Sequence, residues 1–411
     1  MFDIAVIFLV LTALLAYVNQ RFVGLPTTIG VMAIALILSL ALIGLDKLGF
    51  GQLHDFEESL LESIDFSDVL MQGMLSVLLF AGAMHVDLSE LRPYRWQVGL
   101  LAVVGTLVST LIVACALWYF LPLVGVELSL LYCLVFGALI SPTDPIAVMG
   151  ILRSAKAPKN LELVISGESL FNDGVGVVLF SMLLGTIALG VAPTPAQAGL
   201  LLLHEAGGGI VFGLVLGYIT FRLLKSIDNY KVEVMLTLAA VLGGYLLASR
   251  LHVSGPLAMV IAGLVIGNHG RAEAMSDETR AHLDMFWELL DEILNTVLFV
   301  LIGMEALIIP YSPNVVMAAV GTVVITLLAR ALAVGAPVAL LKSLFALPTG
   351  AWQVLTWGGL RGGISVALAL SLPLGPERNV VLALTYAVVV FSILVQGLSI
   401  GKVVRHAARG P

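Results

Sequence analysis

Charged residues are scarce in this sequence. Only 11% of its 411 positions are Asp, Glu, Lys or Arg, whereas 60% are hydrophobic. A soluble domain carries roughly a quarter charged residues, so this composition excludes an ordinary soluble protein. Runs of about twenty apolar residues, the length of a membrane-spanning helix, recur along the chain instead. The chain is therefore predicted to be an all-α polytopic membrane protein.

Cysteine is rarer still, and polar stretches long enough for a soluble domain are absent. The two cysteines, Cys115 and Cys133, both lie in apolar runs, which excludes a disulfide framework and a Cys/His metal site. The N-terminal segment lacks the basic region and the cleavage site of a signal peptide, so we interpret it as a retained first helix. We expect no cofactor and no nucleic-acid partner.

The apolar runs predict thirteen transmembrane helices. With the N-terminus outside, fifteen of the 20 Lys and Arg residues fall on the cytoplasmic side and three fall outside. Such an excess of inside charge supports both the number of helices and a cytoplasmic C-terminus. The predicted segments are 3–20, 24–45, 67–90, 96–121, 129–150, 160–190, 197–221, 232–249, 255–269, 283–308, 313–341, 350–373 and 379–402.

Two of the predicted helices are interrupted. The fifth contains Pro142 and Pro145, which remove backbone donors and break the hydrogen-bond ladder. The twelfth has two glycine pairs around Arg361. Irregular backbone at membrane depth is tolerated only where it is buried in protein or lines a cavity. The two breaks lie seven helices apart, which places them in opposite orientations and predicts inverted repeats with a substrate site where the breaks cross.

Five ionisable residues are predicted to lie within the membrane. Each costs about 2.5–3.5 kcal/mol at a helix centre, so each is expected to be functional or paired. In the sixth predicted helix, one arc of roughly 140° contains a run of polar side chains. The polar groups of that helix either satisfy one another or form a site. The five ionisable residues are Asp144, Glu168, Asp173, Arg330 and Arg361. The arc of the sixth helix contains two of them, Glu168 and Asp173, together with Ser169 and Asn172.

Three motifs resemble the signatures of the cation:proton antiporter-1 family, which includes NhaP-type antiporters and sodium/proton exchangers. They are Ser-Pro-Thr-Asp-Pro at 141–145, Gly-Glu-Ser-Leu-Phe-Asn-Asp at 167–173 and Gly-Gly-Leu-Arg-Gly at 358–362. The resemblance implies an NhaA/NhaP-like fold and a homodimer. It also implies an interface domain (1–92 and 232–308), a core transport domain (93–190 and 313–402), a linker helix (197–226) and a short cytoplasmic tail (403–411).

The resemblance also implies roles for individual residues. Asp173 would carry the ion or the proton, with Asn172 as its partner. Glu168 would form a structural ion pair with Arg330. One departure concerns the third helix, where many relatives carry an acid and this chain has Ala81. The remaining implied residues are Thr143, Asp144 and Ser169 in the cation site, and Pro142, Pro145, Gly359, Arg361 and Gly362 in support of the broken helices.

The acidic tenth segment permits two interpretations. Asp284, Glu288 and Asp291 recur there at helical spacing. The spacing favours a solvated cytoplasmic end of a helix, and the alternative is an acidic vestibule that attracts cations.

A buried carboxylate that binds either a proton or a cation predicts exchange of one for the other. The resemblance implies electroneutral exchange of Na⁺, or of Li⁺ or K⁺, with cation and proton competing for Asp173 in a bacterial-type inner membrane. Monovalent cations, protons and membrane lipids are the expected partners. The alternatives are a K⁺/H⁺ antiporter of the same family and an intramembrane aspartyl protease in which Asp144 and Asp173 form a dyad.

Overall fold

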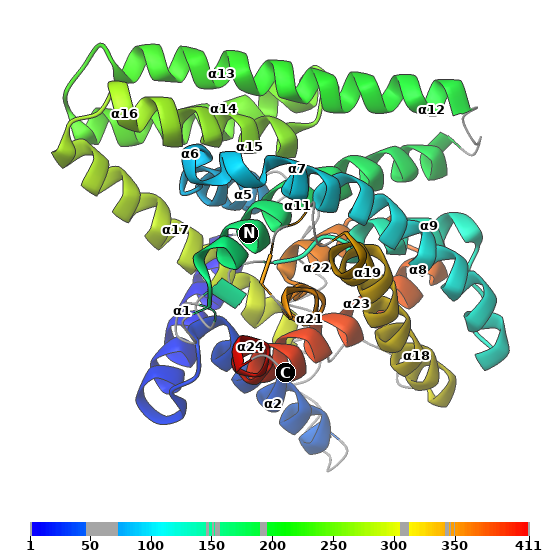
Figure 1. Ribbon diagram of the computed structural model, residues 1–411. Helices are drawn as coiled ribbons and strands as arrows, with labels where there is room; N and C mark the ends of the chain where they lie inside the picture. Colours follow the sequence, from blue (N-terminus) through cyan, green and yellow to red (C-terminus); the bar gives the residue numbers. More distant parts are fainter. Residues whose placement is uncertain are drawn as a thin grey trace.

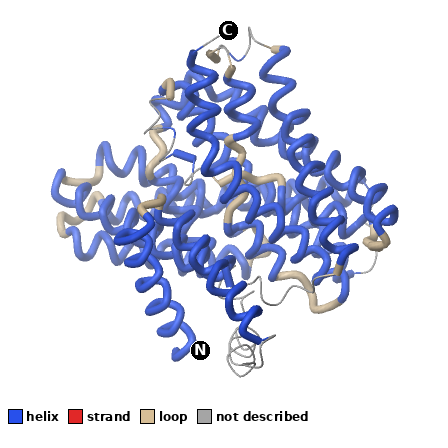
Figure 2. Tube along the Cα trace, turned by 90° about the horizontal axis from the view of Figure 1, so that it is seen from below, coloured by secondary structure: helices blue, strands red, loops and turns tan. Residues whose placement is uncertain are grey.

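The computed structural model describes residues 2–46, 73–144, 148–149, 152, 157–189, 195–304, 312–341, 345, 347–348 and 350–409. All regular secondary structure in these residues is helical, as Figures 1 and 2 show. The helices form two groups, each with its own set of close neighbours.

The first group is built around α15 and α17. Helix α15 packs against α5, α13 and α14, and α17 packs against α1, α2, α5 and α14. In Figure 1, α13 and α14 run side by side along one edge of the molecule. The bounds are α1 (Phe2–Val18), α2 (Thr27–Asp46), α5 (Leu75–Met84), α12 (Pro195–Leu202), α13 (Gly208–Leu224), α14 (Tyr230–Arg250), α15 (Gly255–Val265), α16 (Arg271–Glu273) and α17 (Asp277–Met304).

The second group is built around α9 and α18. Helix α9 packs against α8, α11, α22 and α23, and α18 packs against α8 and α23. The two groups meet where α11 contacts α15 and where α17 contacts α22. The bounds are α6 (Leu88–Leu91), α7 (Arg95–Gly99), α8 (Thr106–Phe120), α9 (Leu130–Ile140), α11 (Lys159–Leu189), α18 (Pro313–Arg330), α19 (Ala336–Leu340), α21 (Ala351–Trp357), α22 (Gly363–Leu370), α23 (Pro376–Phe391) and α24 (Leu398–Arg409).

Short π and 3-10 turns join several of these helices into longer rods. Helix α18, for example, continues through a π turn into α19. The π turns are η1 (Asn19–Val23), η4 (Leu100–Gly105), η6 (Leu203–Gly207), η7 (Ile266–Gly270), η9 (Ala331–Gly335) and η10 (Ser392–Gly397), and the 3-10 turns are η3 (Arg92–Tyr94) and η5 (Leu121–Val124).

Local sequence determines where several helices begin. The side chains of Ser129, Ser254 and Ser312 accept backbone hydrogen bonds at the starts of α9, α15 and α18. Each serine supplies an acceptor for a backbone N–H that has no partner within the helix. Proline occupies the first turn of both α15 and α18, where no N–H is needed.

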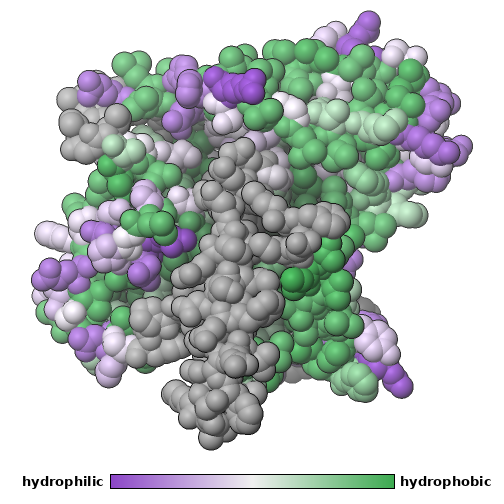
Figure 3. Space-filling model, turned by 180° about the vertical axis from the view of Figure 1, so that it is seen from behind, coloured by the Kyte–Doolittle hydropathy of each residue, from purple (hydrophilic) through white to green (hydrophobic). Residues whose placement is uncertain are grey.

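The surface agrees with a membrane environment. Most of the described surface in Figure 3 is hydrophobic, and hydrophilic residues gather toward opposite edges of that face. Large apolar side chains such as Leu14, Leu214 and Val320 are exposed. A soluble monomer rarely exposes contiguous apolar surface on this scale, so these faces belong in lipid or against another membrane-embedded chain.

Seven helices in the described part of the chain are long and apolar enough to cross a membrane, and three shorter apolar helices accompany them. The number thirteen therefore stays a prediction. Two of the expected segments, 129–150 and 350–373, are interrupted. The segment 67–90 begins among residues outside the described ranges, and α17 carries too many charges to count as an apolar span.

The segment 403–411, expected as a tail, is helical through Arg409 because it forms the second half of α24. Val404 is buried, and Ala407 lies against Gly350. The amphipathic continuation packs one face on the second group of helices.

Candidate functional site

The two interrupted helices meet at their breaks. Helix α9 ends at Ile140 and non-helical backbone follows through Asp144, while α21 and α22 are separated by residues 358–362. The Asp144 N–H donates to the Leu360 carbonyl at 2.8 Å, and Arg361 Nη1 donates to the Pro142 carbonyl at 3.0 Å. Each break therefore satisfies polar groups that the other exposes, which is what irregular backbone in a membrane requires.

Glycine permits this close approach. A Cβ atom at Gly362 would overlap the Asp144 carboxyl group, and one at Gly359 would overlap the Arg330 guanidinium. Both glycines lie in the segment between α21 and α22. The glycine pairs therefore leave room for charged side chains to lie directly against the backbone.

A hydrogen-bond network links the break in α9 to α11. The Thr143 N–H donates to Asn172 Oδ1 at 3.2 Å, and Asn172 Nδ2 donates to Thr143 Oγ1 at 3.0 Å. Asn172 Nδ2 also lies 3.4 Å from Glu168 Oε1, and the Thr143 and Ser169 hydroxyls are 2.9 Å apart. The Thr143 N–H needs an acceptor and the Glu168 carboxylate needs a donor, so the Asn172 amide can bond to both only with its oxygen toward the Thr143 N–H and its nitrogen toward Glu168.

The network continues to α18. Arg330 forms a bidentate ion pair with Glu168, with N–O distances of 2.5 and 2.8 Å. Arg330 also donates to the Leu355 carbonyl in α21 at 3.2 and 3.3 Å. The Arg330 and Glu168 side chains are 7% and 1% exposed. The ion pair therefore ties three helices together in the interior.

Asp173 has different surroundings. It is 7% exposed, yet within the described residues no hydrogen bond to its carboxylate is found. Its charge is opposed by that of Asp144 and attracted by that of Arg361, which is itself 2% exposed. Asp173 is thus a buried carboxylate whose interactions with its described neighbours are electrostatic, beside an asparagine whose amide oxygen and nitrogen are both hydrogen-bonded.

The structure brings together most of the predicted site residues. Asp144, Thr143, Ser169, Asn172 and Asp173 lie at the crossing of the breaks, while Pro145 lies outside the described residues. Ala81 is fully buried in α5.

Three residues near the site, Ser109, Thr110 and Ser365, have no role predicted from the sequence. Ser141 donates to Ser109 on α8 at 2.9 Å and accepts from Thr110 at 3.4 Å. Ser365 donates to the Leu139 carbonyl at 2.7 Å. In the sequence, the signal for the cluster of Ser109, Thr110 and Ser141 is the Ser109–Thr110 pair inside an apolar run.

Helix α17 also contributes a charge to the site. The carboxylate of Asp291 lies within electrostatic range of Asp144. Asn295 donates to Asp291 Oδ1 at 3.2 Å and is 5% exposed. Asp291 is therefore half-buried within electrostatic range of the site, whereas Asp284 is paired with Arg271.

The fold and the site together define an all-helical membrane transporter with two crossed, interrupted helices. The chain belongs to the sodium/hydrogen exchanger family. The model of that family, described as "Sodium/hydrogen exchanger, transmembrane", matches residues 9–406. This match confirms the family predicted from the three motifs.

Individual relatives cover nearly the whole chain. The Na(+)/H(+) antiporter NhaP of Pseudomonas aeruginosa is 56% identical over 100% of this chain and 98% of its own length. The Na(+)/H(+) antiporter NhaH of Halobacillus dabanensis is 35% identical over 91% of each chain. The solved structure of the sodium proton antiporter MjNhaP1 from Methanocaldococcus jannaschii at pH 8 superposes with a TM-score of 0.76, covering 98% of this chain and 97% of that one, at 21% identity. This likeness shows that the two chains share a fold.

Proposed function

We propose that this chain is an electroneutral sodium/proton antiporter in which Na⁺ and H⁺ compete for Asp173. The observation that carries the proposal is the state of Asp173 at the crossing of the two breaks. It is buried, and no hydrogen bond from a described residue occupies it, although the neighbouring polar side chains bond to one another. A carboxylate in this position has oxygen lone pairs available for an ion or a proton.

The groups around Asp173 suit a small monovalent cation. Asp144 adds a second carboxylate, and the hydroxyls of Thr143 and Ser169 add neutral oxygens. Carboxylate, hydroxyl and carbonyl oxygens are hard ligands, which favour hard cations over soft ones. The relatives named above are Na(+)/H(+) antiporters, so Na⁺ is the proposed substrate, with Li⁺ and K⁺ as the ions to compare. The mechanism needs no cofactor.

One titrating carboxylate per cycle supports a one-for-one exchange. Asn172 is neutral, and its amide holds the network between Thr143 and Glu168. The sequence predicts that the broken helix resumes after Asp144, where a carboxylate offsets the positive end of the helix dipole. Asp173 is accordingly proposed as the one group that alternates between proton and cation.

The two groups of helices supply the moving parts. We propose that the group around α9 and α18 moves against the group around α15 and α17, which exposes Asp173 to each side in turn. The group around α15 and α17 would form the homodimer contact through residues in 1–92 and 232–308.

Charge at one end of the bundle supports the predicted orientation. Basic side chains there pair with acids of short neighbouring helices, as in Lys225 with Glu273 of α16 at 3.3 Å and Lys159 with Glu90 of α6. An excess of basic residues marks the cytoplasmic side. We place this end inside the cell, the N-terminus outside and the C-terminus in the cytoplasm.

The test is ion exchange in liposomes that contain the purified chain. Dissipation of an imposed pH gradient is measured on addition of Na⁺, Li⁺ or K⁺, with Asp173→Asn as the inactive variant. Asp277→Asn is the control, because the Asp277 side chain is fully exposed. The proposal predicts Na⁺-dependent exchange in the wild type and the control, and none in Asp173→Asn. A preference for K⁺ over Na⁺ would support a K⁺/H⁺ antiporter, and absence of any cation response would overturn the proposal.

A further inference from the structure

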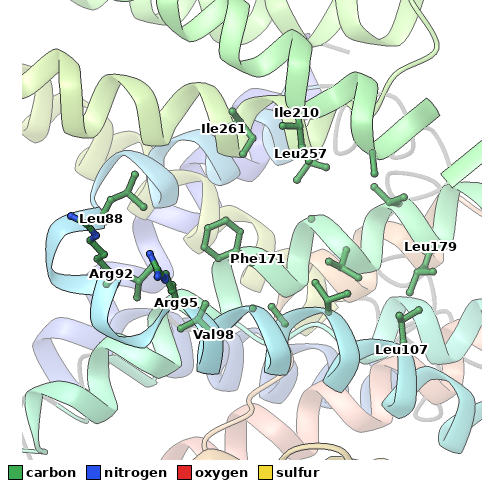
Figure 4. Close-up of a pocket in the computed structure, with 18 residues that line it drawn as sticks. Leu88, Arg92, Arg95, Val98, Leu107, Phe171, Leu179, Ile210, Leu257 and Ile261 are labelled. Atoms are coloured by element: carbon green, nitrogen blue, oxygen red, sulfur yellow. The ribbon is translucent and has the colours of Figure 1, made fainter. Parts of the chain in front are cut away.

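A cavity of about 680 Å³ lies between the two groups of helices. Figure 4 shows Ile210, Leu257 and Ile261 on one wall and Phe171 projecting from α11 on the other. The lining is almost entirely apolar, and its size falls in the range of about 300–1,000 Å³ typical of ligand sites. The site described above does not use this cavity, although Gly174 of α11, the residue after Asp173, lines it.

Two arginines occupy one end of the cavity. Figure 4 shows Arg92 and Arg95 together at the end near Leu88, with Leu107 and Leu179 at the opposite end. Both arginines are exposed. Neither forms a salt bridge in the part of the chain that the structure describes.

The nearby acids are already engaged. Asp87 accepts from the Ser89 hydroxyl and from the backbone N–H groups of Ser89 and Glu90 at the start of α6. These hydrogen bonds lower the pKa of the Asp87 carboxyl, so it stays ionised as a helix cap. Glu90 pairs with Lys159. The two arginine charges at the mouth of the cavity are therefore available to an external anion.

The position of this end along the membrane normal follows from Trp96. This residue is 72% exposed and lies beneath the Arg95 guanidinium, which is 5.7 Å from the ring centroid. Exposed tryptophan marks the level of the lipid headgroups. The arginines thus lie at headgroup depth, and the apolar cavity extends from them toward the hydrocarbon layer.

We propose that this cavity binds an anionic phospholipid, with its phosphate on Arg92 and Arg95 and an acyl chain between α11 and the α13–α15 wall. An acyl chain gains little by leaving other lipid tails for leucine and isoleucine side chains, so selection must come from the headgroup. Guanidinium groups bind phosphate through paired charge-assisted hydrogen bonds. Basic pockets between transmembrane helices are suited to anionic headgroups for this reason.

The headgroup contact is tested by lipid binding to the full chain purified in detergent. Phosphatidylglycerol and zwitterionic phosphatidylcholine are titrated, and bound lipid is counted by native mass spectrometry. Each neutralised arginine is expected to weaken phosphatidylglycerol binding about fivefold, and Arg92→Gln/Arg95→Gln about 25-fold, with phosphatidylcholine binding unchanged. The control is Arg21→Gln/Arg405→Gln, which removes two exposed arginines elsewhere.

The cavity is tested by filling it. A Cβ atom at Gly99 would meet no atom within 4 Å, and Gly99 lines the cavity, so Gly99→Leu places an apolar side chain there without a clash at its base. Gly243→Leu is the matched control, because Gly243 is also helical and open but lies away from the cavity. Gly99→Leu is expected to weaken phosphatidylglycerol binding at least fivefold and Gly243→Leu to leave it unchanged.

Three results would overturn the proposal. Equal losses in the two arginine pairs would mean general attraction of anionic lipid to a basic face. If Gly99→Leu binds phosphatidylglycerol as the wild type does, with its elution profile and melting temperature unchanged, the acyl chain of the lipid lies outside the cavity. Equal binding of phosphatidylcholine and phosphatidylglycerol would remove the role of the headgroup.

Discussion

Adjacent residues of α11 have opposite surroundings. The Asn172 amide is held by Thr143 and Glu168, whereas the carboxylate of Asp173 has no hydrogen-bond partner among the described side chains and backbone groups and faces the charges of Asp144 and Arg361. In the proposed function, the neutral amide maintains the geometry of the site, and its ionisable neighbour exchanges a proton for a cation. This division of roles leads to a pH dependence that can be measured.

Competition at Asp173 predicts how the apparent affinity for Na⁺ changes with pH. Na⁺ binds only the ionised carboxylate, so below the pKa of Asp173 the KM for Na⁺ is expected to rise about tenfold for each unit of falling pH. Above that pKa the KM is expected to be constant, while turnover falls because protons become scarce. Initial rates in liposomes at several pH values test this. A KM independent of pH, or exchange by Asp173→Asn, would mean that another group carries the proton, with Asp144 the next candidate.

The ion pair between Glu168 and Arg330 predicts a stability effect distinct from transport. Both side chains are almost completely buried, so removing either one leaves the other charge unpaired, which costs about 3–5 kcal/mol. Glu168→Ala and Arg330→Ala are therefore expected to lower the melting temperature in detergent more than Asp173→Asn does. The double variant Glu168→Met/Arg330→Met leaves no lone charge and is expected to regain most of the loss. Similar melting temperatures in all four variants would exclude a structural role for the pair.

At the scale of elements, the contact between α9 and α11 depends on the absence of a side chain. A Cβ atom at Gly176 would overlap the Pro142 ring and would lie 3.2 Å from the Ala138 carbonyl. Gly185, on the same helix, has no atom within 4 Å of the position of a Cβ. These two positions allow a comparison in which helix propensity is the same and packing differs.

The same substitution is expected to have opposite effects at the two glycines. Gly176→Ala must separate α9 from α11 and is expected to destabilise the fold by about 1–3 kcal/mol, as overpacking does. Gly185→Ala is expected to stabilise it by up to about 1 kcal/mol through helix propensity. Melting temperatures in detergent check the signs. Equal shifts at the two positions would mean that α9 and α11 are not in close contact in the membrane.

At the scale of the whole molecule, exchange of one positive charge in each direction predicts that the membrane potential has no effect on the rate of exchange. A net elementary charge crossing the membrane would gain or lose about 2.3 kcal/mol per 100 mV. With one proton exchanged for one Na⁺, an imposed potassium diffusion potential should leave the initial rate of exchange unchanged. Liposomes with valinomycin and defined potassium gradients provide the measurement. A reproducible voltage dependence would show that more than one proton moves per cation.

Several site contacts could be predicted from the sequence because they are carried by short motifs. The polar arc of α11 follows from helical geometry, since residues four apart lie on one face. The pairing of Glu168 with Arg330, 162 residues apart, is different, because no local pattern connects them and only resemblance to a family implied it. Ser109, Thr110 and Asp291 were not assigned to the site, since a hydroxyl or an acid in a helix does not itself indicate which helix it faces.

The sequence by itself determined that this protein is a polytopic membrane protein of the sodium/hydrogen exchanger family with an acid at membrane depth. Each transmembrane segment must be apolar by itself, and each family motif is a contiguous stretch of residues. The sequence alone is therefore enough to recognise the segments and the motifs. Only the tertiary structure decided that, among the described residues, the Asn172 amide is hydrogen-bonded while the Asp173 carboxylate is not, that the two breaks bond to each other, and that an apolar cavity opens at two arginines without a salt bridge. These features depend on the packing of side chains from helices distant in the sequence, where a shift of a few tenths of an ångström makes or removes a contact.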